Sequence, residues 1–247
     1  MEMEMLEQTT AVSVQKSQKG SLLISTSSAY AIGVMMAGAA LLAYAGVAWE
    51  SNNLYRFLAY LASASAAGLM RIWTPDRKGS YSLASIYFLL AMAVCSFSEL
   101  AVIGFVSVAV ESGVMTGSRR DLLRVLFNAS AMVVALTAAY YPAYLMLNPN
   151  LRVLLPLALT ISSGLIYLAY TFQLCGLSYL KDKEPFFKTW DKWLMNTFGY
   201  HLLGSTVAII LSVDQRIDDW KLPLPVLPLS FVIFYYYRAS LLRKQKI

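Results

Sequence analysis

Long apolar runs alternate with short polar gaps along the whole of this chain. About eight of these runs are long enough to enter a bilayer, which an α-helix crosses with roughly 20 apolar residues. They lie at about residues 22–49, 54–73, 83–97, 98–115, 126–147, 153–180, 194–213 and 222–237. The pattern predicts an all-α fold, a polytopic integral membrane bundle with about eight transmembrane segments.

The third and fourth runs touch with almost no linker between them. As a single helix their roughly 33 residues would extend about 50 Å at 1.5 Å per residue, which is too long for one pass. We therefore expect a tight hairpin that turns between Ser96 and Glu99.

Composition agrees with a membrane location for most of the chain. Of the 247 residues, 58% are apolar and 14% are charged. Soluble proteins carry roughly 25% charged residues. Eight spans leave room only for short loops, so we expect a polar N-terminal tail over residues 1–20, a transmembrane domain over 21–238 and a basic tail over 239–247.

Positive charge is sorted to alternate gaps between the apolar runs. With the N-terminus inside, all but four of the 20 Lys and Arg residues lie in cytoplasmic segments. The exceptions are Arg56, Arg152, Arg216 and Lys221. Cytoplasmic loops carry the excess of Lys and Arg in membrane proteins, so both termini are predicted to be cytoplasmic.

The basic C-terminal tail is expected to lie against anionic lipid headgroups. It contributes Arg238, Arg243, Lys244 and Lys246.

All five tryptophans fall at the ends of predicted spans. Indole rings prefer the headgroup level of a bilayer, so we interpret these residues as membrane-interface anchors. They are Trp49, Trp73, Trp190, Trp193 and Trp220. The stretch 181–193 mixes charges with aromatics and is predicted either as a short helix along the cytoplasmic face or as a plain connecting loop.

Small residues recur at a four-residue spacing in the first two spans. Gly33 with Ala37, and Ala64 with Gly68, have the spacing that lets membrane helices approach closely. We expect both pairs to hold the bundle together rather than to mediate dimerisation.

Residues that bind metals or act as nucleophiles are few. One histidine, His201, and two cysteines without a metal-binding spacing indicate no metal site and no cofactor. Neither a Ser, His and acid set nor a phosphate-binding glycine loop points to catalytic residues, so the protein is expected to be non-enzymatic. A basic patch with interleaved aromatics is also missing from the sequence, which argues against nucleic acid as a partner.

A few polar side chains lie inside the predicted spans, where each needs a partner or a purpose. Glu99, at the hairpin turn, either lies in the headgroup layer or caps a helix, or it forms a ligand or cation site. His201 is interpreted as a hydrogen-bonded packing residue rather than a proton relay. A sensor is expected to have a ligand cavity lined by Asn128, Tyr140, Tyr144 and His201, and a transporter a site near Glu99, Asn128 and His201.

Four stretches of the chain resemble a known family. They cover residues 54–70, 97–104, 125–141 and 227–242, with the sequences LYRFLAYLASASAAGLM, FSELAVIG, VLFNASAMVVALTAAYY and LPLSFVIFYYYRASLL. In order and spacing they resemble the multi-pass N-terminal sensory module that precedes GGDEF or HD-GYP domains in some bacterial cyclic-di-GMP enzymes, especially acidobacterial ones. The resemblance implies a membrane-embedded receiver whose last helix passes a conformational change to the cytoplasm. The chain carries no GGDEF or HD-GYP sequence, so it is expected to be a stand-alone relative or a fragment, and the cyclic-di-GMP chemistry does not carry over.

These observations predict a non-enzymatic sensor-like or accessory subunit in the bacterial inner membrane, with a role in signal transduction. It would bind a small apolar or amphiphilic ligand or another membrane protein. Expected partners are the lipid bilayer and a membrane or cytoplasmic protein, and a homo-oligomer is compatible with the sequence. The alternative is a small-solute transporter or its membrane-embedded substrate-binding component, although we find no inverted repeat. A purely structural subunit would share the same fold.

Overall fold

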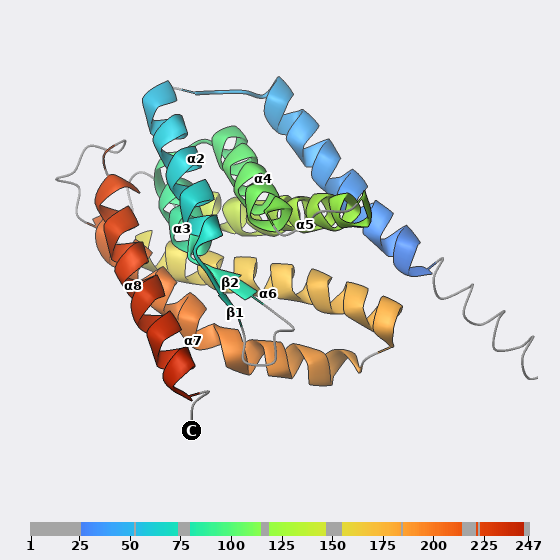
Figure 1. Cartoon of the computed structure of the whole chain (residues 1–247). Helices are drawn as coiled ribbons and strands as arrows, with labels where there is room; N and C mark the ends of the chain where they lie inside the picture. The colour runs from blue at the N-terminus through green and yellow to red at the C-terminus, as the bar shows by residue number, and fades with distance from the viewer. Residues whose placement is uncertain are drawn as a thin grey trace, which may run out of the picture.

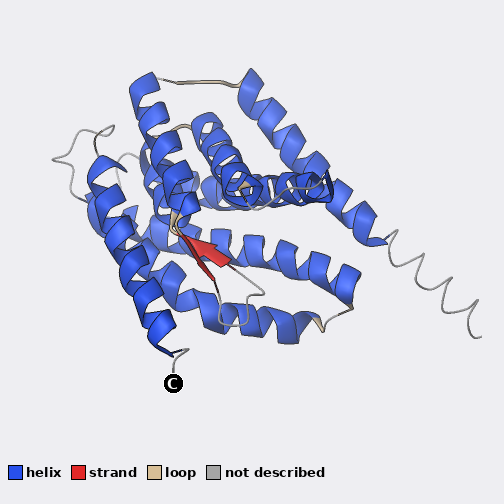
Figure 2. Ribbon diagram, viewed as in Figure 1, coloured by secondary structure: helices blue, strands red, loops and turns tan. Residues whose placement is uncertain are grey.

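The computed structural model describes residues 26–51, 53–73, 80–114, 119–146, 155–183, 185–213, 221 and 223–244. The polar tail predicted over residues 1–20 lies outside these ranges. An N-terminal helix, Thr26–Val47, is followed by α2 (Leu54–Leu69), α3 (Ala84–Val94), α4 (Phe97–Gly113), α5 (Arg119–Met146), α6 (Leu155–Asp182), α7 (Phe186–Val213) and α8 (Pro223–Lys244). The helical class is confirmed (Figures 1 and 2), and each predicted apolar run overlaps one of these helices.

A short antiparallel ribbon between α2 and α3 was not predicted. Its strands are β1 (Arg71–Trp73) and β2 (Ser80–Ser82), paired so that Arg71 lies opposite Ser82. The sequence reasoning treated the end of the second apolar run as helix, whereas α2 ends at Leu69.

Helix ends differ from the predicted ones mainly on the cytoplasmic side of the expected topology. The stretch 181–193 forms neither a surface helix nor a long loop, because α6 continues to Asp182 and α7 begins at Phe186. Helix α8 likewise continues to Lys244, so most of the predicted basic tail is helical. Charged residues are good helix formers, and a hydropathy pattern alone does not show where such a helix stops.

Three of the described helices are long and apolar enough to cross a membrane. They are Thr26–Val47, Leu122–Met146 within α5, and Leu155–Asp182. Two shorter apolar helices, Ala84–Val94 and Pro223–Tyr236, fall below the length needed for a full pass. The membrane character expected from the sequence is confirmed for these three helices.

Helices α5, α6 and α7 lie side by side as one layer, which runs across the view in Figure 1. Adjacent helices in the layer are antiparallel. Gln173 Nε2, late in α6, donates to the carbonyl of Ala131 in the first half of α5, and Ser162 Oγ, early in α6, donates to the carbonyl of Ala139 further along α5. The N-terminal helix rests on this layer, where the Tyr30 hydroxyl donates to the Gln173 carbonyl at 3.3 Å.

Helices α2 and α4 run parallel and in register. Arg56 of α2 pairs with Glu99 of α4 at one end. Twelve positions later in each helix, about 18 Å along the axis, a Cβ on Gly68 would lie 3.4 Å from Glu111 Cβ. Helix α3 lies between α2 and α4 in the chain. Most of its residues are buried in the main core, together with Tyr60, Leu100 and Leu136.

The two small-residue pairs have different roles. Ala64 and Gly68 are buried between α2 and α4, as predicted. Gly33 and Ala37 are exposed instead, and nothing lies within 4 Å of a Cβ built on Gly33, so the expectation that this pair holds the bundle together is wrong. The inner face of the N-terminal helix uses Gly38, whose Cβ would lie 2.5 Å from Ser130 Cβ.

Candidate functional site

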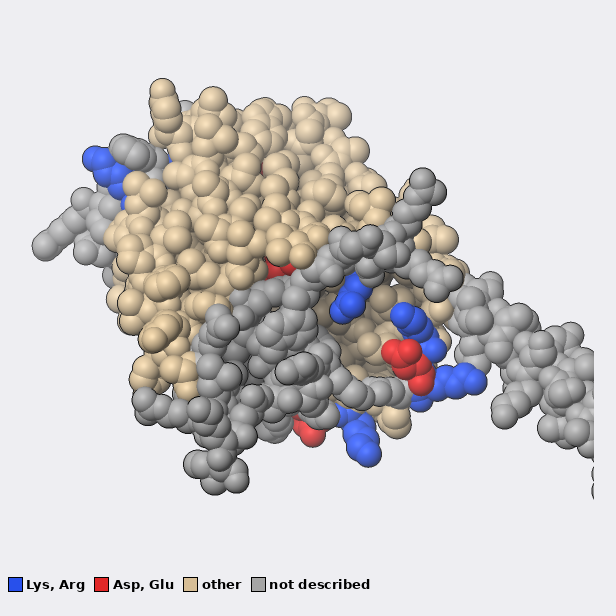
Figure 3. Space-filling view, viewed as in Figure 1, with Lys and Arg blue, Asp and Glu red and all other residues tan. Residues whose placement is uncertain are grey.

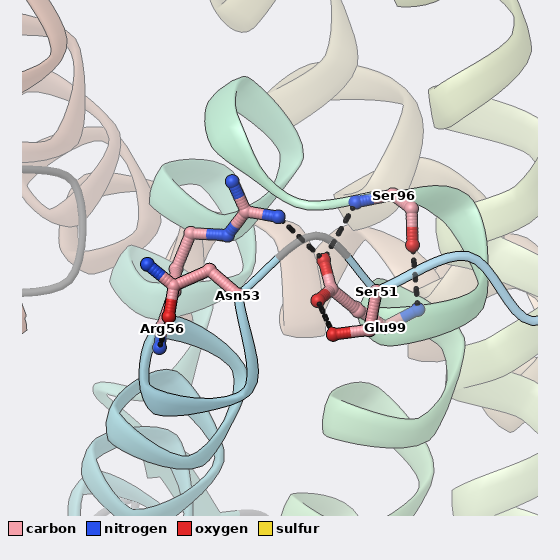
Figure 4. Close-up of polar contacts among 5 residues, drawn as sticks. All are labelled: Ser51, Asn53, Arg56, Ser96 and Glu99. Atoms are coloured by element: carbon pink, nitrogen blue, oxygen red, sulfur yellow. Dashed lines mark hydrogen bonds and ion pairs between the residues drawn. The ribbon is translucent and has the colours of Figure 1, made fainter.

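Glu99 lies at the centre of a buried polar cluster that joins three segments of the chain (Figure 4). Its side chain is 0% exposed. Oε1 accepts a hydrogen bond from Ser51 Oγ at 2.8 Å, and Oε2 accepts from Arg56 Nη2 at 3.1 Å and from the Ser96 backbone N–H at 2.9 Å. Ser51 comes from the linker after the N-terminal helix, Arg56 from α2 and Ser96 from the turn before α4.

Local sequence builds both helix starts in this cluster. Ser96 and Glu99 form a reciprocal capping box, in which Ser96 Oγ also accepts from the Glu99 backbone N–H. Asn53 caps α2 in a similar way, with its side-chain oxygen accepting from the Arg56 backbone N–H at 3.1 Å. Unpaired N–H groups at a helix start need such acceptors, and a carboxylate there also favours the helix dipole.

The structure therefore favours the helix-cap interpretation of Glu99 over an open ligand or cation site. In the described part of the chain, the carboxylate accepts hydrogen bonds from Ser51, Arg56 and Ser96, and its charge is balanced by Arg56, whose side chain is only 12% exposed. An isolated charge at this depth would be costly, whereas a pair with supporting hydrogen bonds recovers much of that cost. The break predicted between the third and fourth runs is confirmed, but it lies at Cys95 and Ser96 rather than over Ser96 to Glu99, since α3 ends at Val94 and α4 begins at Phe97.

A second carboxylate lies at the other end of α4. Glu111 Oε2 accepts a hydrogen bond from Ser82 Oγ at 2.8 Å, next to the β1–β2 ribbon. Each end of α4 is thus attached through a glutamate to a segment that precedes it in the chain. The sequence reasoning did not select Glu111.

His201 is bonded into the contact between α6 and α7. Nε2 lies 2.9 Å from the Ser163 carbonyl oxygen and 2.7 Å from Ser163 Oγ. A carbonyl oxygen only accepts, so this geometry assigns the proton to Nε2. Ser205 Oγ donates to the His201 carbonyl, which leaves Ser163 Oγ to donate to Ser205 Oγ.

These hydrogen bonds among His201, Ser163 and Ser205 determine the chemical role that the imidazole can have. Because Nε2 donates, it is not a base toward the Ser163 hydroxyl, and the pair does not form the nucleophile and base arrangement of acyl-transfer enzymes. Tyr167 packs on the imidazole with a centroid distance of 4.9 Å. The side chain is a hydrogen-bonded packing residue, as the sequence analysis expected.

The five candidate ligand residues do not share one cavity. Tyr140 and Tyr144, near the end of α5, stack on each other with ring centroids 6.2 Å apart. Tyr140 also contacts Phe97 at the start of α4, close to Glu99. Asn128 lies three turns away on α5, where Nδ2 donates to Ser112 Oγ at 3.3 Å. His201 lies beyond α6, which separates it from α5. The expected cavity lined by Asn128, both tyrosines and His201 is therefore not what the fold assembles.

The predicted membrane anchors are described only in part. Trp49 is 41% exposed after the N-terminal helix and packs edge-on against Phe57 at 5.3 Å. Trp190 is half-buried, and its indole N–H donates to Thr171 Oγ1 at 3.2 Å. The side chains of Trp73, Trp193 and Trp220 lie outside the described residues, as do those of Arg238, Arg243, Lys244 and Lys246.

Sequence reasoning missed the partners of its own candidates. The spacing Ser96-x-x-Glu99 is a capping-box signature and was sufficient to predict the helix start at Phe97. No local signal marks Arg56, Ser163 or Ser205, since their partners lie far away in the chain. Among the described residues, no group of three His, Cys, Asp or Glu side chains is placed to hold a metal ion.

Comparison with known proteins adds no relative. No family model, curated protein or solved structure matches this chain.

Proposed function

We propose that this chain is a non-enzymatic, sensor-like or accessory subunit of a bacterial inner membrane that binds a small amphiphilic or apolar ligand or another membrane protein. One observation carries the proposal. The side chains of Glu99 and His201, two polar residues within predicted spans, form hydrogen bonds with other residues of the chain, while much of the described surface is apolar. A ligand or a membrane protein can bind to such a surface without any catalytic residues.

The first and last helices both expose large apolar side chains. Only 11% of the apolar stretch of the N-terminal helix is buried, and Met36 and Val47 are strongly exposed. Helix α8 exposes Phe231, Val232, Tyr235 and Tyr236 on one side. Surfaces of this kind are covered by lipid or by another membrane protein.

Several features support an eight-span topology with both termini in the cytoplasm. The parallel register of α2 and α4 agrees with the second and fourth spans of that topology, while α3 between them, with 11 residues, is shorter than a full pass. On the face shown in Figure 3, most of the described surface is uncharged, and Lys and Arg gather mainly near one end. Lys181, Lys183 and Lys188 are exposed around the α6–α7 turn, in a segment predicted to be cytoplasmic.

The resemblance to bacterial sensory modules supports an output through α8. This helix packs on α2 and β1, and within it the Ser230 hydroxyl donates to the Val226 carbonyl at 2.8 Å. The Tyr87 hydroxyl of α3 lies 3.3 Å from Ser230 Oγ. Because the Ser230 proton is donated to Val226, Tyr87 is the donor in this hydrogen bond between α3 and α8. A change in α2 would reach α8 through their direct packing, and a change in α3 would reach it through the Tyr87–Ser230 contact.

Native mass spectrometry of the protein extracted gently from its own membrane tests the proposal. A protein partner at fixed stoichiometry supports the accessory-subunit form, and a bound small molecule supports the sensor form. Solute uptake into liposomes that contain the purified protein, driven by an ion gradient, would instead establish the transporter. If the extracted protein carries neither a partner nor a bound molecule, the proposal fails.

A further inference from the structure

Four aromatic rings form a continuous row at the end of the molecule that holds Glu99. They come from the N-terminal helix, α4 and α5, and they are Tyr44, Phe97, Tyr140 and Tyr144. Successive ring centroids lie 6.1, 5.5 and 6.2 Å apart. The two rings at the ends of the row, Tyr44 and Tyr144, are 62% and 67% exposed.

The row differs from an ordinary aromatic belt. Belt tyrosines act singly, each with its hydroxyl at the headgroup level. Here three helices bring their rings into contact with one another, and Tyr140 and Tyr144 lie nearly parallel, with 18° between the ring planes. The other two contacts are tilted, with 50° and 56° between the ring planes, so the row brings both ring faces and ring edges together at one place.

Basic side chains are absent from the described segments that form the row. Residues 26–51, the first turn of α4 and residues 133–146 contain Glu50 and Glu99, and no Lys or Arg. Arg56 reaches this end from α2, but its charge is balanced by Glu99. Glu50, in the same linker as Ser51, is exposed. The described segments that form the row therefore offer an anionic headgroup no unpaired basic partner.

Ring faces carry the negative part of the aromatic quadrupole and attract cations, most strongly ammonium groups that shed water easily. We infer that the row from Tyr44 to Tyr144 binds the quaternary ammonium headgroup of an amphiphile. Its acyl chain lies along the exposed apolar side chains beside the row, such as Val47 and Leu145. This inference rests on the proposed function, because it names the class of the amphiphilic ligand.

Two matched probes test the charge requirement on the unaltered protein. The protein is placed in phosphatidylglycerol nanodiscs, which contain no ammonium group, and titrated calorimetrically with hexanoylcholine. The comparison probe is 3,3-dimethylbutyl hexanoate, in which a carbon replaces the nitrogen. Empty nanodiscs correct for partition of either probe into lipid. Hexanoylcholine should bind roughly tenfold more tightly than its neutral isostere.

Substitutions test the location. In Tyr140→Leu/Tyr144→Leu the affinity for hexanoylcholine should fall roughly tenfold, whereas Tyr140→Phe/Tyr144→Phe keeps the rings and should bind as the unaltered protein does. Tyr235→Leu/Tyr236→Leu is the matched control, since these exposed tyrosines lie on α8. Thermal unfolding of each variant shows whether the fold is retained.

Equal affinity for the two probes overturns the inference, and so does unchanged binding by a folded Tyr140→Leu/Tyr144→Leu variant. The probe comparison needs no substitution, so it stays decisive if that variant fails to fold. A different small molecule found by native mass spectrometry, together with no binding of hexanoylcholine, would remove this inference and leave the proposed function in place.

Discussion

Arg56 Nη2 lies 3.1 Å from Glu99 Oε2, and this ion pair joins the first turn of α2 to the first turn of α4. The two residues are 43 positions apart in the chain. Glu99 is fully buried, so its negative charge is balanced mainly by Arg56. The pair therefore fixes the register in which two parallel helices pack.

Replacing Glu99 with Gln should destabilise the protein by about 3 kcal/mol, because Arg56 is left as an uncompensated charge at a largely buried position. Thermal unfolding in nanodiscs, followed by near-ultraviolet circular dichroism, measures the change. Glu50→Gln removes an exposed carboxylate in the adjacent linker and should change stability by less than about 0.5 kcal/mol. The double variant Arg56→Met/Glu99→Gln should recover part of the loss, and equal effects of the two single Gln substitutions would contradict this account.

Ser96→Ala should cost about 1 kcal/mol, since the Glu99 backbone N–H loses its acceptor at the start of α4. The effect is local, so hydrogen exchange of the amides at residues 97–100 should accelerate. Thr206→Ala is a suitable control, because that exposed hydroxyl bonds only within its own helix, to the Leu202 carbonyl. Unchanged exchange at the start of α4 would show that Ser96 does not cap it.

His201→Ala should weaken the packing of α7 on α6 by roughly 2 kcal/mol. Hydrogen bonds between membrane helices contribute about 0.6 kcal/mol on average, so most of the loss comes from the ring that packs on Tyr167. Ser205→Ala removes only a hydroxyl from the same set and should cost about 0.6 kcal/mol. Unfolding in nanodiscs compares the two, and a larger loss for Ser205→Ala would reverse the assignment.

Two glycines of the N-terminal helix should respond oppositely to alanine. Gly38→Ala places a methyl group 2.5 Å from Ser130 Cβ and should cost about 1–3 kcal/mol through overpacking. Gly33→Ala meets nothing within 4 Å and should be neutral or stabilising by up to about 1 kcal/mol, because alanine is the better helix former. The difference between the two unfolding temperatures is the measurement, and similar temperatures would place the helix differently from the structure.

Prediction from sequence was most successful for the helices. Apolar runs located all eight described helices, and the length of the third and fourth runs together correctly indicated a break between them, although it lies at Cys95 and Ser96 rather than over Ser96 to Glu99. The start of α7 and the end of α8 were predicted too close to the apolar runs, because Lys-rich and aromatic residues are compatible with either helix or loop. Gly33 shows a further limit, since the spacing of small residues does not reveal which face of a helix turns inward.

For the candidate site, the sequence likewise indicated individual residues but not the residues that they contact. Glu99, His201, Tyr140 and Tyr144 were selected because polar and aromatic side chains in apolar helices are unusual. Their partners Arg56, Ser163 and Phe97 come from other helices and have no sequence signal of their own. A cavity was expected to unite these residues with Asn128, but the length of α5 and the position of α6 keep them apart.

The sequence by itself determined that this is a helical protein of membrane type, because hydropathy and helix length depend on each residue and its near neighbours. Only the tertiary structure decided that Glu99 is balanced by Arg56, that His201 is bonded within the α6–α7 contact, and that four rings meet at one end. Those outcomes depend on how whole helices pack, which is set by contacts between residues distant in the chain.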